Sequence, residues 1–318
     1  MNILETLSQN VCVSGNEIAA LLNISRAAVH KQINVLRKNG YVISSSKKGY
    51  TLVKRADILS ENEIKSFFKK LPAIAGKIIC YDKIDSTQTK IKTLAESAAA
   101  TAAGGLVICA EEQTQGYGRR KRSWSSNRGG LWFSFLLKPK ISPNDVTKIA
   151  LIISVAINRV LEKKYGVNSK IKWPNDILAD GKKLCGIITE MSASAEDGAV
   201  KWVAAGVGIN VSNVLPKELK NESASLKEIT KANINRAELL AAVLQELDGT
   251  CAKFIKNGFE AFYGEYNKKS AFINENVVLD TGFDIIKGIN LGVSKNGELL
   301  LKTAGGIEKI ISGTLRKS

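Results

Sequence analysis

One segment of the chain combines the residue types that bind anionic ligands. Residues 116–124 read GYGRRKRSW, so two glycines precede four consecutive basic residues, a serine and a tryptophan. Glycine lets the backbone approach a ligand closely, arginine binds carboxylate or phosphate through paired hydrogen bonds, and tryptophan can stack on a flat heterocycle. The loop therefore suits an anionic ligand with a ring, such as a nucleotide. A solvated run of charges is the alternative interpretation of the four basic residues alone.

Three further motifs follow in order, and together with the loop they indicate a family. KWPND occupies residues 172–176, Lys-Leu-Cys-Gly residues 183–186 and Gly-Val-Gly-Ile-Asn residues 206–210. With Gln113 and the Gly-Tyr-Gly-Arg loop, these motifs resemble biotin protein ligases in order and spacing. The likeness runs over nearly the whole chain, including both ends, and so resembles the bifunctional bacterial form that also represses biotin genes. KWPND alone is fairly specific, and all five motifs in order are very specific.

The resemblance implies an enzyme, a biotin–[biotin carboxyl-carrier protein] ligase, with two steps. Biotin and ATP first give biotinyl-5′-AMP and pyrophosphate, and biotin then passes to one lysine of a biotin carboxyl carrier protein, such as an acetyl-CoA carboxylase subunit. The protein must hold two anions together and stabilise charge developing at phosphorus, which is a task of positioning and electrostatics. Biotin, ATP and the Mg²⁺ that accompanies ATP are the implied cofactors.

The resemblance assigns three catalytic residues. Lys183 stands seven residues after Asp176, where the family has its catalytic lysine, and would bridge the biotin carbonyl and the phosphate. Arg119 matches the second arginine of the family's Gly-Arg-Gly-Arg loop and would contact carboxylate or phosphate. Asp176 is a hypothesis for the group that helps to deprotonate the carrier lysine. Without the flanking motifs, the lysine pair at 182–183 could equally be a surface turn.

The resemblance also assigns the ligand contacts. The biotin set is Ser86, Thr87, Gln88, Gln113, Tyr117, Gly118, Arg119, Lys183, Gly186, Gly206 and Gly208. The nucleotide set is Trp124, which would pack on adenine, with Lys172, Asn175, Asn210 and Arg316, the last in a Gly-Thr-Leu-Arg tail whose arginine would reach the ATP phosphates. Taken alone, Asp-Ser-Thr at 85–87 is an ordinary helix N-cap, and a tryptophan is often a core residue.

Two positions depart from the family pattern. Tyr117 replaces the first loop arginine and removes one cation, and Gln88 replaces an asparagine with a longer amide that has the same donors and acceptor. These departures are the only support for an alternative from another class, a transcriptional regulator that senses biotin without ligase activity. A lipoate-attaching ligase is a further alternative, against which KWPND and the N-terminal segment favour biotin.

Residues 1–53 have the pattern of a winged helix-turn-helix. Three helical segments, two of them capped by Ser14 and Ser25, precede two short strands at 41–45 and 50–53. The second helix of such a motif enters the major groove, and basic residues of the wing meet phosphates. The predicted DNA contacts are Ser25, Arg26, His30, Lys31, Asn34, Lys47 and Lys48. An accessory domain that binds protein, or nothing, is the alternative.

The remaining pattern completes an α+β chain. The expected domains are the winged helix-turn-helix at 1–55, a linker at 56–71, a mixed-sheet ligase domain resembling class II synthetases at 72–270, and a small SH3-like β-barrel at 271–318. The last segment changes to short strands and glycine turns, with an Asn-Gly hairpin signal at 296–297.

Composition limits the function classes. The chain has 318 residues, 44% of them hydrophobic, and no apolar run of the ~20 residues that a membrane span needs. Five dispersed cysteines, a single histidine and no secretory pattern favour a cytoplasmic protein without a protein-ligated metal site or a Ser/His/Asp triad.

The net charge of +16 suits DNA and other anionic partners, but residues 1–55 hold only eight basic residues against two acidic ones, so DNA binding does not account for all of it. As implied partners we expect operator DNA, the carrier protein and a second copy of the chain in an adenylate-bound homodimer, and no membrane.

Overall fold

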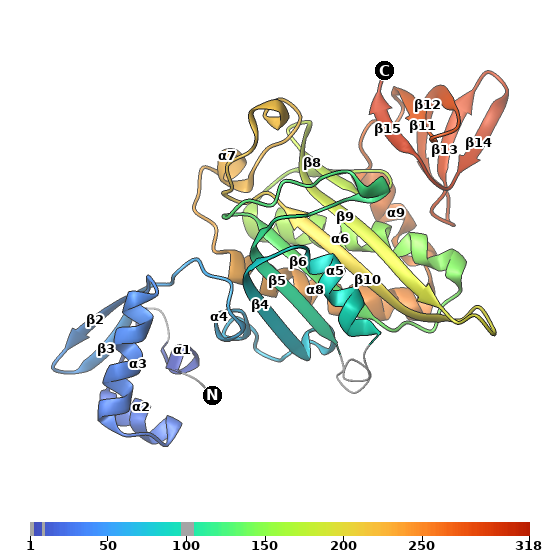
Figure 1. The fold of residues 1–318 in the computed structure, drawn as a ribbon. Helices are drawn as coiled ribbons and strands as arrows, with labels where there is room; N and C mark the ends of the chain where they lie inside the picture. The colour runs from blue at the N-terminus through green and yellow to red at the C-terminus, as the bar shows by residue number, and fades with distance from the viewer. Residues whose placement is uncertain (1–2, 8–9, 97–104) are drawn as a thin grey trace. The chain divides into compact units, whose positions relative to one another are not determined.

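The computed structural model describes residues 3–7, 10–96 and 105–318, which fall into two units (Figure 1). The N-terminal unit comprises Met1–Leu71 with Ile234–Ala241, and the large unit comprises Pro72–Asn233 with Ala242–Ser318. Each unit has its own sheet and buried residues. They are therefore described in turn.

The N-terminal unit has the expected order of helix, helix, helix and hairpin. Ser14 Oγ accepts a hydrogen bond from Glu17 N and Ser25 Oγ accepts one from Ala28 N, so both predicted caps are present. Asn23 ends the second helix in the left-handed conformation, at φ 52°. The elements are α1 (Ile3–Thr6), β1 (Cys12–Val13), α2 (Gly15–Leu22), α3 (Arg26–Lys38), β2 (Val42–Ser46), β3 (Gly49–Lys54) and α4 (Glu61–Lys65), with strand order β1-β3-β2.

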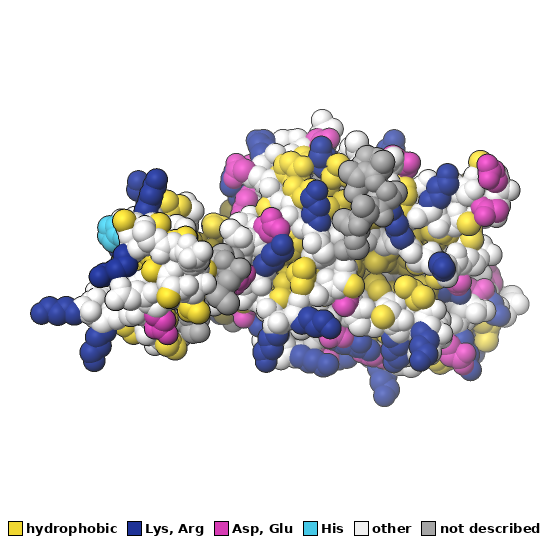
Figure 2. Space-filling view, turned by 90° about the horizontal axis from the view of Figure 1, so that it is seen from below, with side chains coloured by type: hydrophobic (Ala, Val, Ile, Leu, Met, Phe, Trp, Pro, Cys, Tyr) yellow, Lys and Arg dark blue, Asp and Glu magenta, His cyan; other side chains and the backbone are white. Residues whose placement is uncertain are grey.

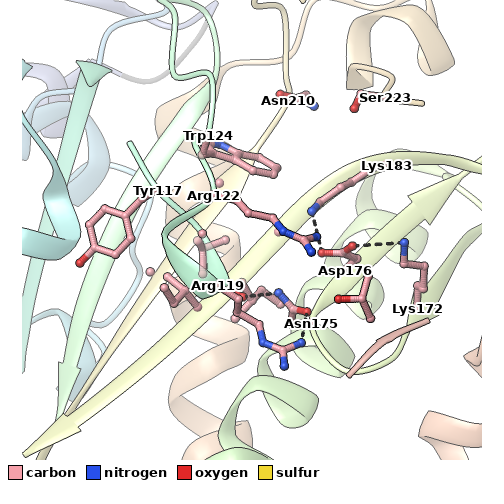
Figure 3. Close-up of a pocket in the computed structure, with 18 of the residues that line it drawn as sticks. Tyr117, Arg119, Arg122, Trp124, Lys172, Asn175, Asp176, Lys183, Asn210 and Ser223 are labelled. Carbon is pink, nitrogen blue, oxygen red and sulfur yellow. Dashed lines mark hydrogen bonds and ion pairs between the residues drawn. The ribbon is translucent and has the colours of Figure 1, made fainter. Parts of the chain in front are cut away.

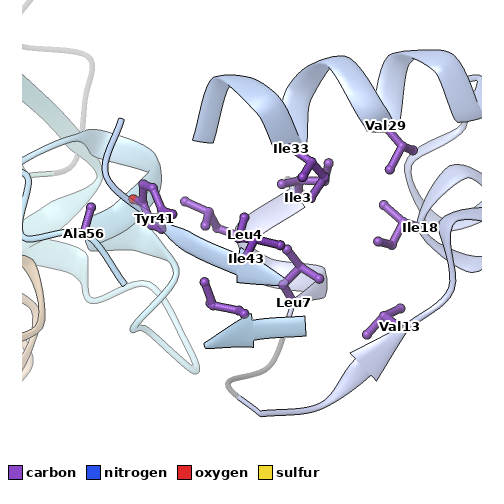
Figure 4. Packing of buried hydrophobic residues seen from close by; sticks show 11 residues of the cluster. Ile3, Leu4, Leu7, Val13, Ile18, Val29, Ile33, Tyr41, Ile43 and Ala56 are labelled. Carbon is purple, nitrogen blue, oxygen red and sulfur yellow. The ribbon is translucent and has the colours of Figure 1, made fainter. Parts of the chain in front are cut away.

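The core of this unit lies between the helices and the hairpin (Figure 4). Ile18 of α2, Val29 and Ile33 of α3, and Leu52 of β3 are completely buried. Val29 and Ile33 are four residues apart and therefore share one face of α3, which leaves the opposite face to polar residues. The same four-residue spacing can be read in the sequence.

The segment expected as a linker, residues 56–71, contains α4 and belongs to the N-terminal unit. Its helix α4 carries Glu63, whose side chain is buried and accepts hydrogen bonds at Oε2 from Tyr41 Oη at 2.6 Å and Arg55 Nη1 at 3.1 Å. At the start of α8, Arg236 is buried and donates from Nε to Asp57 Oδ2 at 2.9 Å. These two ion pairs, in each of which one side chain is buried, fix the segment within the N-terminal unit.

A seven-stranded mixed sheet forms the large unit. Its order is β4-β5-β6-β10-β9-β8-β7, in which β4 and β5 run parallel and the other neighbours run antiparallel. The strands are β4 (Lys77–Ile84), β5 (Leu106–Gln113), β6 (Leu131–Leu137), β7 (Ser169–Lys172), β8 (Asp176–Ala179), β9 (Lys182–Ala193) and β10 (Val200–Ile209).

Helices pack against this sheet (Figure 1). α5 contributes the buried Ile91, which packs with Ile108 of β5 and Ala204 of β10, while α6 packs against β7, β8 and β9. The helices are α5 (Thr87–Ala95), α6 (Val146–Tyr165), α7 (Leu226–Thr230), α8 (Arg236–Asn257) and α9 (Glu260–Lys269), with 3-10 turns η1 (Ala73–Ala75), η3 (Arg119–Lys121), η4 (Pro143–Asp145) and η5 (Lys217–Leu219). The mixed α+β class is confirmed, and no helix among the described residues has the length and apolarity to cross a bilayer.

The C-terminal segment is a five-stranded antiparallel sheet. Its strands are β11 (Asn276–Asp280), β12 (Ile285–Val293), β13 (Leu299–Thr303), β14 (Gly306–Ile310) and β15 (Thr314–Lys317), in the order β14-β13-β12-β11-β15. The Asn-Gly signal marks the β12–β13 hairpin, where Gly297 has φ 82°. Within the described part of this sheet, β14 and β15 are the two edges and do not pair. The expected SH3-like barrel is therefore not confirmed as a closed barrel.

We predict that burial, rather than helix propensity, makes α3 stable. Val29→Ala should lower the free energy of unfolding of the N-terminal unit by about 1.5–3 kcal/mol, because two buried methyl groups are lost and a cavity remains. Val35→Ala makes the same change on the same helix where the side chain is 50% exposed, and should cost little or nothing. Urea unfolding followed by circular dichroism measures both, and equal effects would contradict the prediction.

Candidate functional site

A cavity of about 710 Å³ opens in the large unit, a volume typical of small-molecule sites (Figure 3). Every residue that the sequence predicted for catalysis and for the biotin and nucleotide contacts lines it. These are Ser86, Thr87, Gln88, Gln113, Tyr117, Gly118, Arg119, Trp124, Lys172, Asn175, Asp176, Lys183, Gly186, Gly206, Gly208, Asn210 and Arg316. The structure thus gathers residues from across 230 positions of sequence.

The KWPND turn is positioned by its bonds to β9. Asn175 O accepts from Ile187 N at 2.9 Å, and Asn175 Nδ2 donates to Ile187 O at 2.7 Å. The Trp173–Pro174 peptide is cis, and Trp173 Nε1 donates to Gly297 O at 3.2 Å. These bonds place Asp176, the first residue of β8, opposite Gly186 of β9.

Asp176 lies between two ammonium groups. Its Oδ1 is 2.8 Å from Lys183 Nζ and its Oδ2 is 3.5 Å from Lys172 Nζ (Figure 3). Asp176 is 8% exposed, so this carboxylate is largely screened from water and its attraction to both lysines is strong. The ammonium of Lys183 also lies 4.9 Å from the Trp124 ring centroid. The arrangement holds a cation at the cavity wall, where it can stabilise negative charge on a reacting group.

Two glycines make room for Trp124. A Cβ at Gly208 would lie 2.5 Å from Trp124 Nε1, and a Cβ at Gly186 would lie 2.9 Å from Trp124 Cζ3, both too close for any side chain. Trp124 also meets Trp132 edge-on, with ring centroids 6.4 Å apart. Its Nε1 is buried and has no hydrogen-bond partner among the described residues. Trp124 therefore packs against protein and still lines the cavity.

The basic loop is a closed turn with two anchors. Tyr117 pairs with Ser123 in a β-bridge, and Gly118 N donates to Arg122 O at 2.8 Å. Arg119 reaches out of the turn and donates to Asn175 Oδ1 at 3.2 Å and to Gly313 O at 3.1 Å (Figure 3). Burial, followed by the nearby Arg120 and Arg122, lowers the pKa of Arg119 below its usual value.

A second anchor joins the loop to the C-terminal sheet. Arg120 Nη2 donates to Thr281 O at 2.6 Å, beside Gly282, while Arg119 Nη2 donates to Ser312 Oγ at 3.0 Å. The C-terminal sheet thus contributes backbone and hydroxyl partners to the loop. Arg316 lies on β15, lines the cavity and is exposed to solvent.

Hydroxyls and amides form a hydrogen-bonded network at the cavity. Gln113 Oε1 accepts from Thr87 N at 2.8 Å and from Thr87 Oγ1 at 3.0 Å, and Gln113 Nε2 donates to Ser126 Oγ at 2.8 Å. Ser86 caps α5 as the local pattern indicated and lines the cavity as well. Ser134 Oγ lies 2.9 Å from Thr87 Oγ1. The sequence missed Ser134, which lines the cavity, and Ser126, which holds Gln113, because single serines in strand and loop carry no local signal.

Glu190 is a side chain beside the site that the sequence missed. Its Oε2 accepts from Gln88 Nε2 at 2.9 Å and from Tyr117 Oη at 3.0 Å, and its Oε1 accepts from Lys92 Nζ at 2.7 Å. Burial alone would raise the pKa of Glu190, but these three donors hold it below its usual value. The spacing of Gln88 and Lys92 at i and i+4 on α5 is the only sequence signal for the cluster.

Two further observations concern the environment of Asn210 and the side chains that could hold a metal ion. Asn210 is buried at the end of β10, and its Oδ1 accepts from Asn213 Nδ2 at 3.1 Å. Among the described residues no group of three or more His, Cys, Asp or Glu side chains is placed to hold a metal ion.

The DNA-binding candidates lie together on the N-terminal unit. Arg26, His30 and Lys31 are exposed on α3, and Asn34 Nδ2 lies 3.3 Å from His30 Nδ1. Ser25 caps α3, and Lys47 and Lys48 are exposed in the β2–β3 turn. Basic side chains stand out from the surface of this unit (Figure 2). Arg37, which was not among the predicted contacts, donates to Ile43 O at 2.7 Å and to Ser45 Oγ at 2.6 Å, and so ties α3 to the hairpin.

Comparison with known proteins agrees with this arrangement. Residues 1–51 match the family described as HTH domain, residues 81–210 the Biotin/lipoate A/B protein ligase family, and residues 272–314 the Biotin protein ligase C terminal domain. The chain is 36% identical to the bifunctional ligase/repressor BirA of Bacillus subtilis, over 99% of this chain and 97% of that protein, and 29% identical to that of Escherichia coli over 99% and 96%.

A solved structure is similar to part of the chain. The biotin protein ligase of Aquifex aeolicus in complex with biotin and ATP superposes with a TM-score of 0.67 and 32% sequence identity, covering 76% of this chain and 99% of that one.

We predict that the absence of a side chain at position 208 sets the place of Trp124. Gly208→Ala puts a methyl group inside contact distance of the indole and should displace it, which raises acrylamide quenching of tryptophan fluorescence and changes the near-ultraviolet circular dichroism. Gly249→Ala on α8 is the matched control, because nothing lies within 4 Å of a Cβ there. That control should leave both spectra unchanged and stabilise the helix by about 0.5–1 kcal/mol. Spectra of Gly208→Ala that match wild type would refute the prediction.

Proposed function

The chain belongs to the biotin protein ligase family in its bifunctional ligase/repressor form, and from this we propose its reaction and the residues that perform it. It activates biotin with ATP to biotinyl-5′-AMP, transfers biotin to a lysine of a biotin carboxyl carrier protein, and represses biotin genes from an operator. The observation that carries the enzymatic part is the Lys183–Asp176 pair at 2.8 Å on the wall of a ligand-sized cavity.

Two buried polar atoms without partners support the binding of biotin and a nucleotide in this cavity. Gln88 Oε1 and Trp124 Nε1 are both buried without a hydrogen-bond partner among the described residues, so one acceptor and one donor remain for a bound molecule. We assign Ser86, Thr87, Gln88 and Gln113 to the ureido ring of biotin, beside a floor formed by Gly206 and Gly208. Trp124, Asn175, Asn210, Lys172 and Arg316 are assigned to the nucleotide. Mg²⁺ would arrive with ATP and neutralise phosphate charge.

Lys183 serves both steps in this proposal. In the first step, the biotin carboxylate attacks the α-phosphorus and pyrophosphate leaves, while Lys183 and Arg119 stabilise the added negative charge. In the second step, the carrier amine attacks the carbonyl of the mixed anhydride and AMP leaves, while Lys183 stabilises the oxyanion. Asp176 holds Lys183 in place and is the carboxylate assigned to take the proton from the carrier amine.

Several finer assignments belong to the same proposal. We infer domain boundaries at 1–55, 56–71, 72–270 and 271–318, a central sheet of the class II synthetase type and a small SH3-like C-terminal domain. The protein would act in the cytoplasm. Adenylate binding would favour a homodimer that presents two copies of α3 to a two-fold operator.

We predict that biotin transfer depends on Lys183. Lys183→Ala should lower the rate of labelled biotin incorporation into an apo carrier domain, with ATP and Mg²⁺, by about 10²–10³-fold, because one charge-stabilising donor is lost. Lys182→Ala is the matched control: its ammonium donates to Lys220 O at 3.2 Å, outside the cavity lining, and activity should persist.

Two results would count against this reading. Transfer by Lys183→Ala at the wild-type rate would remove Lys183 from the mechanism. Biotin binding without transfer by folded wild-type protein would favour a regulator that only senses biotin.

We predict that the two lysines of the β2–β3 turn, the wing, bind DNA phosphates. Replacing Lys47 and Lys48 together by Ala should reduce the slope of log affinity for duplex DNA against log salt concentration by about 2, because each lysine contributes about one phosphate contact. The same double change at Lys163 and Lys164, both exposed on α6 of the large unit, should leave the slope unchanged. Fluorescence anisotropy with a labelled duplex measures both variants, and equal slopes would place the DNA elsewhere.

A further inference from the structure

The two departures from the family pattern meet at one carboxylate. Gln88 stands where the family has asparagine, Tyr117 stands where it has arginine, and both donate to the same oxygen of Glu190, at 2.9 Å and 3.0 Å. The residues come from three separate elements, since Gln88 belongs to α5, Tyr117 to the basic loop and Glu190 to β9. Two substitutions that look independent in the sequence are therefore a single structural feature.

The cluster is electrically balanced. Lys92 donates to the other oxygen of Glu190 at 2.7 Å and lies 5.7 Å from the centre of the Tyr117 ring. Burial and the neighbouring Glu190 raise the pKa of Tyr117 above its usual value, so the phenol stays protonated and keeps its donor. Charge-assisted hydrogen bonds of this kind are stronger than neutral ones. Tyr117 therefore holds the loop in place without a bound ligand.

The cluster also fixes which way the amide of Gln88 faces. Gln88 Nε2 donates to the Glu190 carboxylate and to Ala204 O at 3.0 Å, and both partners can only accept. Gln88 Oε1 must then point the other way, where it is buried without a partner among the described residues and lies 2.7 Å from the place of a Cβ on Gly206. Gln88 Oε1 is therefore an acceptor at the cavity that can bind an N–H donor of the ligand.

We propose that Glu190, neutralised by Lys92, is a positioning residue that couples the basic loop to ligand recognition. Through Tyr117 it holds residues 116–124 over the cavity before ligand binds, and through Gln88 it presents an amide oxygen to a ureido N–H. The inference rests on the proposed biotin ligase function. Its consequence is that biotin meets a loop that is already in place, so less of the binding energy is used in ordering it.

The first test measures loop position without any catalysis. Arg120, Lys121 and Arg122 are exposed, so trypsin can cut the loop whenever it leaves the sheet. In ligand-free protein, Tyr117→Phe should speed cleavage at these three residues about tenfold, because one hydrogen bond to a charged acceptor is lost. Mass spectrometry of the loop fragment measures the rate of cleavage. Tyr263→Phe on α9 makes the same chemical change outside the cavity lining and should cleave at the wild-type rate.

The second test separates positioning from chemistry in the biotin-transfer assay. Tyr117→Phe and Glu190→Gln should each raise the KM for biotin about tenfold while kcat stays within about twofold, because Lys183 and Arg119 are untouched. Glu190→Gln removes the charge that strengthens the Tyr117 hydrogen bond, and Tyr117→Phe removes its donor. Because both changes act on one shared contact, their effects in the double variant should be less than additive.

Three outcomes would overturn the coupling: unchanged cleavage in Tyr117→Phe, a loss that falls on kcat alone, or additive effects in the double variant. The proteolysis result stands even if the protein proves not to transfer biotin, so failure of the coupling and failure of the ligase function remain distinguishable.

Discussion

The ion pair between Asp176 and Lys183 depends on the pairing of β8 with β9, and most of the site depends on that pair. The ladder places Asp176 opposite Gly186, and the register shift between Ile177 and Leu178 brings Lys183 back beside the carboxylate. A side chain at position 186 would strike Trp124, and a moved Trp124 would lose its contact with the Lys183 ammonium. A change of one residue in this register would turn Lys183 to the opposite face of the sheet.

The basic loop also depends on contacts from distant parts of the chain, because its backbone is strained. Arg120 and Lys121 both adopt φ 54°, a left-handed conformation that costs a non-glycine residue roughly 1–2 kcal/mol. The cost is offset where the turn directs Arg119 to Asn175 and Arg120 to Thr281. The C-terminal sheet is therefore part of the site, because it supplies the carbonyl groups that hold the strained turn. An open sheet is sufficient for this role, since the contacts come from the ends of β11 and the segment before β15.

Sequence reasoning succeeded where the determining residues are neighbours in the chain. The caps at Ser14 and Ser25, the Asn-Gly hairpin and the KWPND turn are all local, and each lies where the sequence predicted it. Glu190 was missed because its importance comes from the packing of α5 and the loop against β9, which no window of sequence contains. Glu63 was missed for the same reason, since only the fold brings it to Tyr41 and Arg55. Barrel closure likewise depends on whether two distant edge strands pair.

The substitution at position 117 need not weaken a ligase, because the cavity keeps its positive charge. Seven basic side chains line it, namely Arg119, Arg120, Arg122, Lys172, Lys183, Arg316 and Lys317, against two carboxylates, Asp176 and Glu222. An anionic adenylate therefore still enters a strongly positive field, and one missing cation changes that field little. What Tyr117 changes is the partner of Glu190, since a neutral donor on that carboxylate leaves the charge of Glu190 to be balanced by Lys92. The substitution thus changes the task of position 117: the tyrosine adds an anchor at Glu190 to those that Arg119 and Arg120 make, and the remaining basic side chains keep the field that attracts the anion.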